Sequence, residues 1–312
     1  MREKAADLTP GQDNTWERRF GASARAVYRR TLLELARVRE EIFCLEADLG
    51  PADYPFRRLF PGRYVELGIA EANMMGVAAG LASTGKVPFV NTMATFAATR
   101  ACEQIKLDLA YNRCNVKIVA THGGVSAGPL GPTHHSGEDI AVMRAIPGMM
   151  VVVPADAAEA AMAVRAVAGV DGPCYVRLGR DPTPLIYRGP YPFTLGRAVE
   201  LRPGSDLTLI AAGAPTVHLA LEGAARLAAR GIDARVVNMH TIKPLDEESV
   251  VRAARETGAI VTVEEHGPHG GLGSAVAEVV VRECPVPVRI LSLPDAFCEE
   301  PGTQEEIMER CG

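Results

Sequence analysis

The sequence alternates short β-branched, apolar runs with longer alanine-rich stretches, and this alternation constrains the fold more than any other feature. In the first part of the chain the expected strands are residues 42–47, 64–67, 87–92, 116–121, 150–153 and 174–178. The stretches between them that carry apolar residues at helical spacing are residues 70–82, 99–111, 135–145 and 157–168. This pattern is typical of an α/β fold with doubly wound, mainly parallel sheets.

A proline-rich segment interrupts the alternation and indicates a boundary between two domains. Four prolines fall between residues 181 and 192, where they suit neither a helix nor a strand interior. The alternation resumes with expected strands at 207–211, 234–239, 260–263 and 288–293, separated by helices at 216–230, 247–256 and 273–282. We therefore predict a first α/β domain at residues 20–185, a linker at 186–204 and a smaller α/β domain at 205–312.

The composition argues against several classes of partner. The 312 residues carry a formal net charge of −5 and only 5% aromatic side chains, which argues against nucleic acid binding. No stretch reaches the ~18 apolar residues of a membrane span, and the first 20 residues are too polar for a signal peptide. Seven scattered cysteines indicate reduced thiols. We expect a cytoplasmic protein that binds neither nucleic acid nor membrane.

Ligands of doubly wound sheets bind beyond the carboxyl ends of the strands, so residues that follow the expected strands are candidate site residues. Glu71 follows one strand at the start of a helix, where its carboxylate could also simply complement the helix dipole. Phe96 follows the next strand and could equally be a core residue. Arg177 and Arg180 end another strand; they suit a phosphate or carboxylate ligand, or an interdomain salt bridge.

Residues 121–135 directly follow an expected strand and contain four glycines and three histidines. A loop of this kind is costly to order unless it has a task, and its histidines can donate hydrogen bonds or move protons near neutral pH. A metal site is the rival interpretation. No HExxH helix and no neighbouring Cys or Asp complete a ligand set, so we predict no metal ligands in this chain. The glycines of Gly270-Gly-Leu-Gly273 indicate either a tight turn or, weakly, a phosphate site.

Five segments, taken together and in this order, resemble the C-terminal two-thirds of transketolase. They are Glu66-Leu-Gly-Ile-Ala-Glu71-Ala-Asn, Gly131-Pro-Thr-His134, Arg144-Ala-Ile-Pro-Gly-Met149, Thr241-Ile-Lys-Pro-Leu-Asp246, and Val263-Glu-Glu-His266 with Gly270-Gly-Leu-Gly-Ser-Ala-Val. The resemblance runs from about Arg25 to about Leu293. It implies the pyrimidine-binding domain of that family followed by its C-terminal domain.

The resemblance implies thiamine diphosphate as the cofactor and gives roles to several candidate residues. Glu71 matches the family glutamate that hydrogen-bonds N1′ of the aminopyrimidine, which makes it both a catalytic and a cofactor-binding residue. Phe96 matches an aromatic residue that stacks on the pyrimidine, and Met93 stands where the family has another aromatic. His134 matches a catalytic histidine that also contacts substrate hydroxyls.

Further positions match the family's substrate-binding site. His122 matches a histidine near the sugar phosphate, and Arg180 and Arg25 match arginines that bind that phosphate. Leu130 stands where the family has an aspartate that reads a donor hydroxyl. A leucine buried there cannot accept a hydrogen bond, which would leave a facing sugar hydroxyl unpaired at a cost of about 1–3 kcal/mol. We therefore expect a specificity other than plain xylulose 5-phosphate.

The family's diphosphate-binding motif, Gly-Asp-Gly with a downstream Asn, does not occur in this sequence. The resemblance therefore implies the C-terminal (beta) subunit of a split transketolase. A separate N-terminal subunit would hold most of the diphosphate and Mg²⁺, in an α2β2 assembly in which the chain also self-associates. The expected reaction is transfer of a two-carbon ketol unit between sugar phosphates. The alternatives are a 2-oxoacid dehydrogenase E1 beta subunit, a deoxyxylulose phosphate synthase-like subunit, or a non-catalytic paralogue.

Overall fold

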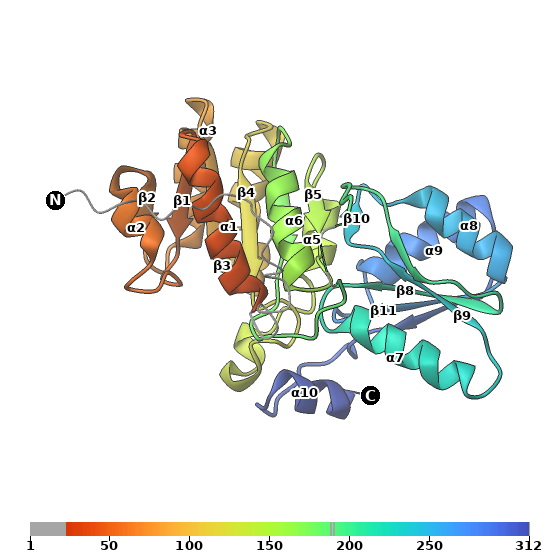
Figure 1. The fold of residues 1–312 in the computed structure, drawn as a ribbon. Helices are drawn as coiled ribbons and strands as arrows, with labels where there is room; N and C mark the ends of the chain where they lie inside the picture. Colours follow the sequence, from red (N-terminus) through yellow and green to blue (C-terminus); the bar gives the residue numbers. More distant parts are fainter. Residues whose placement is uncertain (1–22, 188, 190, 312) are drawn as a thin grey trace.

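The chain folds into two sheets of mainly parallel strands with helices on both faces of each sheet (Figure 1). The structure is a computed structural model that describes residues 23–187, 189 and 191–311. The first sheet has seven strands in the order β10-β5-β6-β4-β3-β1-β2, and the second has five in the order β12-β11-β8-β9-β7. Only the pairs β10–β5 and β7–β9 are antiparallel in these sheets. The predicted doubly wound α/β fold is confirmed.

The strands lie close to their expected positions. Those of the first sheet are β1 (Ile42–Glu46), β2 (Tyr64–Glu66), β3 (Val87–Met93), β4 (Lys117–Thr121), β5 (Met150–Val152), β6 (Cys174–Arg177) and β10 (Thr241–Lys243). Those of the second sheet are β7 (Val199–Arg202), β8 (Leu207–Ala212), β9 (Ala234–Asn238), β11 (Ile260–Glu264) and β12 (Val288–Leu291).

The longer helices lie before, between and after these strands. They are α1 (Ala24–Val38), α3 (Glu71–Ser83), α5 (Asp139–Ala145), α6 (Ala157–Ala168), α7 (Thr216–Ala228), α8 (Glu247–Thr257), α9 (Leu272–Glu283) and α10 (Gln304–Cys311). Short helical turns are α2 (Pro55–Leu59), η2 (Pro61–Arg63), α4 (Cys102–Gln104), η5 (Gly128–Leu130) and η6 (Pro132–His134). No helix in the described part of the chain has both the length and the apolar character that a membrane crossing requires.

Local sequence signals fix where several helices begin. Asp156, directly before α6, accepts a hydrogen bond from the backbone N–H of Glu159 at 2.7 Å, as a capping carboxylate does at an orphan amide. Asp246 caps α8 in the same way through the N–H of Ser249, at 3.1 Å. These caps mark where α6 and α8 begin.

The segment between β3 and β4 departs from the expected regular helix at residues 99–111. It contains two π-helical turns, η3 (Phe96–Arg100) and η4 (Ile105–Tyr111), on either side of α4. π-Helical turns insert extra residues into a helix and are frequent at functional sites, because they re-aim neighbouring side chains. Here they carry Phe96 and Arg100.

The two sheets are joined more closely than a flexible linker would allow. Strand β10 follows β9 of the second sheet but pairs with β5 of the first, with Thr241 opposite Val152. Strand β7 lies within residues 186–204, which we expect to be a linker, and pairs with β9 because its apolar side chains Val199 and Leu201 pack on the second core. One hydrophobic core runs from the first sheet into the second through residues such as Val153, Ile210 and Met239.

Candidate active site

Parallel strands place the predicted site residues at one edge of the first sheet. Glu71 lies five residues beyond β2, Met93 ends β3 and His122 directly follows β4. Strands β1 to β4 and β6 run in the same direction, so their carboxyl ends meet at this edge. Arg180 follows β6 at the same edge. The alternation of the sequence therefore brings together residues that are more than 100 positions apart.

Glu71 is the first residue of α3, and its side chain is only 2% exposed. Nη1 of Arg100 donates to both of its carboxylate oxygens, at 2.9 Å each. The guanidinium carbon of the same arginine lies 4.0 Å from the centroid of the Phe96 ring, within the range of a cation–π contact. Sequence reasoning missed Arg100, because a single arginine four residues after Phe96 matches no motif.

Phe96 also contacts a second predicted site residue. The rings of Phe96 and His134 lie 5.3 Å apart between centroids and are inclined at 70°, an edge-to-face arrangement. Thr133 Oγ1 and Nδ1 of His134 share a hydrogen bond of 2.9 Å, which orients the imidazole. Met93 is partly exposed at the end of β3, three residues before Phe96. Phe96 therefore contacts His134 directly and Glu71 through Arg100, so the three predicted residues lie in one group.

His122 lies beside the predicted phosphate-binding arginines. It adopts a positive φ of 60°, is 3% exposed, and shares a 2.9 Å hydrogen bond through Nδ1 with Thr121. Burial, and then the positive charges of Arg25 and Arg180, lower its pKa to about 4. The imidazole is therefore neutral near pH 7 and is available for hydrogen bonding beside these cations.

Arg25 and Arg29 of α1 and Arg180, which follows β6, lie close enough for their charges to interact. Burial and the neighbouring charges of Arg29 and Arg180 lower the pKa of Arg25. Nε of Arg180 lies 3.8 Å from the carboxylate of Asp181, at the outer limit of an ion pair. Like charges held together in this way favour the binding of an anion that relieves their repulsion.

The structure corrects one property expected of Leu130. The expectation is a buried leucine, but this side chain is 44% exposed. It occupies the last position of η5, whose chain then reverses at Gly131 with a φ of 77°. Because the turn projects outward, the apolar side chain remains at the surface of the described chain instead of entering its core.

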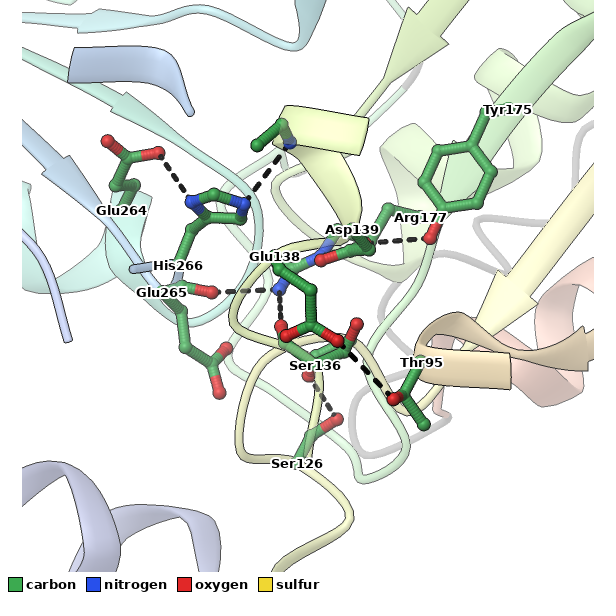
Figure 2. Close-up of polar contacts among 12 residues, drawn as sticks. Thr95, Ser126, Ser136, Glu138, Asp139, Tyr175, Arg177, Glu264, Glu265 and His266 are labelled. Atoms are coloured by element: carbon green, nitrogen blue, oxygen red, sulfur yellow. Dashed lines mark hydrogen bonds and ion pairs between the residues drawn. The ribbon is translucent and has the colours of Figure 1, made fainter. Parts of the chain in front are cut away.

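A buried network anchors the glycine-rich loop that carries His122 and His134 (Figure 2). Arg177, 5% exposed, donates through Nε to Asp139 Oδ2 at 2.9 Å and through Nη2 to the carbonyls of Ser136 and Glu265, at 3.2 and 2.8 Å. Tyr175 donates to the same Asp139 oxygen at 2.7 Å. Arg177 therefore forms a salt bridge, but within the first domain and not between domains as the salt-bridge interpretation expected. Its contact with the second domain is the hydrogen bond to the Glu265 carbonyl.

Glu265 links the same loop to the C-terminal part of the chain. Its carboxylate accepts the backbone N–H of Val125 at 2.8 Å and the side-chain amide of Gln304 at 2.8–2.9 Å. Burial raises its pKa to about 7, although Arg177 and these donors favour the charged form. Figure 2 shows Glu265 extending toward the loop from the second domain.

The glycine-rich turn before α9 is structural. Glu264 accepts the backbone N–H groups of Leu272 and Gly273 at 2.6 and 2.7 Å, so a carboxylate of the chain itself occupies this helix N-terminus. A Cβ atom at Gly271 would overlap Oε2 of Glu264, which explains why glycine is needed there. The tight-turn interpretation of Gly270-Gly-Leu-Gly273 accounts for this segment.

A cleft of about 620 Å³ opens between the two domains beside the glycine-rich loop. Its walls include Thr95, Pro132, Glu138, Gly267 and Phe297. Within the described ranges, no three or more His, Cys, Asp or Glu side chains gather in a way that could hold a metal ion.

Both parts of the chain match domains of one known protein family. Residues 21–184 match the pyrimidine binding domain of transketolase, and residues 196–312 match the transketolase C-terminal domain. The chain belongs to the transketolase family. The transketolase alternative among the thiamine enzymes is therefore the correct one.

Similar proteins match this chain over most of its length. The chain is 45% identical over 290 residues to the 6-deoxy-6-sulfo-D-fructose transketolase subunit SqwH of Clostridium sp. (strain MSTE9), covering 92% of this chain and 89% of that one. It is 46% identical over 289 residues to a subunit of the apulose-4-phosphate transketolase of Phocaeicola vulgatus, covering 90% of each. This chain therefore corresponds to the beta subunit of a split transketolase, a transferase.

A solved structure shares the fold along nearly the whole chain. It is described as a split gene transketolase, inactive beta4 tetramer, and superposes with a TM-score of 0.85 at 44% identity. The superposition covers 94% of both chains. The similarity includes both transketolase domains and their relative arrangement.

Proposed function

We propose that this transketolase subunit, together with a separate diphosphate-binding subunit, transfers a two-carbon ketol unit between sugar phosphates with thiamine diphosphate and Mg²⁺. The observation that carries the proposal is the grouping of Glu71, Phe96 and His134 at the carboxyl edge of the first sheet. A buried carboxylate and a flat aromatic face are what an aminopyrimidine requires for a hydrogen bond and for stacking.

The residues of this chain fit the pyrimidine part of the cofactor. Glu71 would hold the proton shared with pyrimidine N1′, Phe96 would support the ring, and Met93 would border it. When bound, thiamine diphosphate supplies the nucleophilic carbon and the electron sink for carbon–carbon bond chemistry. We assign the diphosphate and the Mg²⁺ to the partner subunit, because the family's Gly-Asp-Gly motif does not occur in this sequence.

The substrate-binding residues fit a sugar that ends in an anionic group. Arg25 and Arg180 supply positive charge, and neutral His122 beside them supplies a hydrogen bond. His134 stands against Phe96, where it can contact the hydroxyls of the reacting part of the sugar. Leu130, which stands where the family has an aspartate, has no polar atom that could bind a donor hydroxyl.

The proposed assembly is an α2β2 heterotetramer in the cytoplasm. Self-association of this subunit is supported by the related split gene transketolase, whose beta chains form a tetramer described as inactive. The net charge of −5 and the low aromatic content argue against nucleic acid or an anionic membrane surface as a partner.

Co-expression with a candidate partner tests the proposal. The partner is a protein that carries Gly-Asp-Gly and a downstream Asn, and the two chains should co-purify. The complex, supplied with thiamine diphosphate and Mg²⁺, should transfer a ketol unit between a phosphorylated ketose and aldose, measured by chromatography of the sugar products. A complex that forms but shows no ketol transfer with a panel of phosphorylated donors would refute the proposal.

A further inference from the structure

Arg100 combines two contacts that the proposed function assigns to the cofactor. Its guanidinium lies 4.0 Å from the Phe96 ring centroid, and its Nη1 donates to both oxygens of Glu71 at 2.9 Å. The Phe96 ring and the buried Glu71 carboxylate, the two groups that a pyrimidine would use, are thus both contacted by a side chain of this chain.

A guanidinium resembles an aminopyrimidine in the properties that matter here. Both groups are planar, both stack on aromatic faces, and both can share N–H hydrogen bonds with a carboxylate. The guanidinium of Arg100 already lies over the Phe96 ring, at 4.0 Å from its centroid, while His134 contacts the same ring at 5.3 Å and 70°. A pyrimidine bound to Glu71 and Phe96 would have to occupy the place of this guanidinium.

The energetics explain why Arg100 adopts this position. Glu71 is 2% exposed, and a buried carboxylate without a partner is strongly unfavourable. The side chain of Arg100 remains 45% exposed, so it can return to water when another group takes over Glu71. A hollow lined by Ala72, Glu103 and Lys106 lies beside it and offers space and a carboxylate for the displaced side chain.

We propose that Arg100 is an internal occupant of the pyrimidine position, which closes this half of the site until the cofactor displaces it. The inference rests on the proposed function, because it takes Glu71 and Phe96 as the pyrimidine site. It assigns Arg100 a specificity role: only a ligand that satisfies both the carboxylate and the ring can exchange with the guanidinium.

Titration calorimetry of the complex with its diphosphate-binding partner tests the proposal. Thiamine diphosphate is titrated in the presence of Mg²⁺ into complexes that carry the wild-type chain, R100A or R100M. Both variants remove the competing guanidinium, so each should bind the cofactor about tenfold more tightly, equivalent to about 1.4 kcal/mol. R100K keeps the charge but loses the planar group, and its affinity should lie between those of the wild type and R100A.

The outcomes separate the inference from the function on which it rests. If the wild-type complex binds thiamine diphosphate and R100A binds it equally or more weakly, Arg100 is not a competing occupant and the inference is wrong. If neither complex binds the cofactor, the proposed function fails and the inference fails with it.

Thermal unfolding of the chain alone gives a readout that does not depend on the cofactor. R100A should lower Tm, because Glu71 loses its partner, and the double variant E71Q/R100A should recover part of that loss. An unchanged Tm in R100A would show that the Arg100–Glu71 pair does not form in solution, which would also overturn the inference.

Discussion

At the scale of single residues, the proposed chemistry depends most on the carboxylate of Glu71. Substitution E71Q keeps the size and one hydrogen-bonding oxygen but removes the exchangeable proton. We expect the assembled complex to lose turnover by a factor of about 10²–10⁴, the usual contribution of general acid–base catalysis, with its fold retained. The measurement is kcat, with Tm as the control for folding. Turnover within a factor of two of the wild type would remove Glu71 from the mechanism.

The second prediction at this scale concerns Arg180. Removal of its positive charge in R180A should raise KM for phosphorylated acceptors about tenfold or more, because a charge-assisted hydrogen bond contributes roughly 1.5–3 kcal/mol. The matched measurement uses the unphosphorylated form of the same acceptor, for which KM should change little. Equal effects on both acceptors would deny Arg180 a role in phosphate binding.

The sequence alone was enough to propose a role for some site residues and not for others. The resemblance pointed to Glu71, Phe96 and His134, and the fold brings them together through the shared edge of parallel strands. Arg100 could not be found in this way, because its position depends on the π-helical turn that carries it. For Arg177 the residue type left phosphate binding and a salt bridge open; only the buried contact with Asp139 decides between them.

At the scale of elements, Glu265 connects β11, the glycine-rich loop and α10. Its pKa is raised by burial to about 7, so folding favours the neutral carboxyl group. This contribution to stability is complete below the usual pKa of about 4.5 and is lost as pH rises through 7. E265Q is neutral at every pH. Its free energy of unfolding relative to the wild type should therefore increase between pH 5 and pH 8, by about 1–3 kcal/mol.

Urea unfolding at several pH values measures this difference. E299Q, a substitution of an exposed glutamate in the same C-terminal region, serves as the control and should show no comparable pH dependence relative to the wild type. A difference between E265Q and the wild type that stays constant from pH 5 to pH 8 would contradict the prediction.

Elements with strong local patterns were predictable, and those that depend on distant partners were not. The β-branched runs and the Asp156 cap locate β4, β6 and α6 within a few residues. Strand β10 has three residues, and its partner β5 lies about 90 positions earlier in the chain. No local pattern specifies such a pairing, which therefore appears only in the three-dimensional structure.

At the scale of the whole molecule, Arg177 connects the two domains beside the glycine-rich loop. It forms an ion pair with Asp139 of the first domain and donates to the backbone carbonyl of Glu265 in the second. The side chains of Arg177 and Asp139 are 5% and 0% exposed. R177M would leave Asp139 as an uncompensated buried charge and should lower the free energy of unfolding by about 3–5 kcal/mol. Urea unfolding provides the measurement. R165M breaks an exposed pair between α6 and α1 and should have a much smaller effect; equal losses in the two variants would contradict the assigned role.

The chain contains both transketolase domains, on which we place the proposed pyrimidine position and the proposed phosphate-binding arginines. The Gly-Asp-Gly motif that the family uses for the diphosphate does not occur in the sequence. The central claim is therefore that this chain contributes half of an active site, which a second subunit completes.

A titration of the two separately purified subunits tests this claim most directly. A fixed amount of this chain, with saturating thiamine diphosphate and Mg²⁺, receives increasing amounts of the diphosphate-binding subunit, and ketol transfer is measured at each ratio. We predict no activity from either subunit alone and a linear rise that saturates at one partner per chain. Substantial ketol transfer by this chain without its partner would contradict the claim.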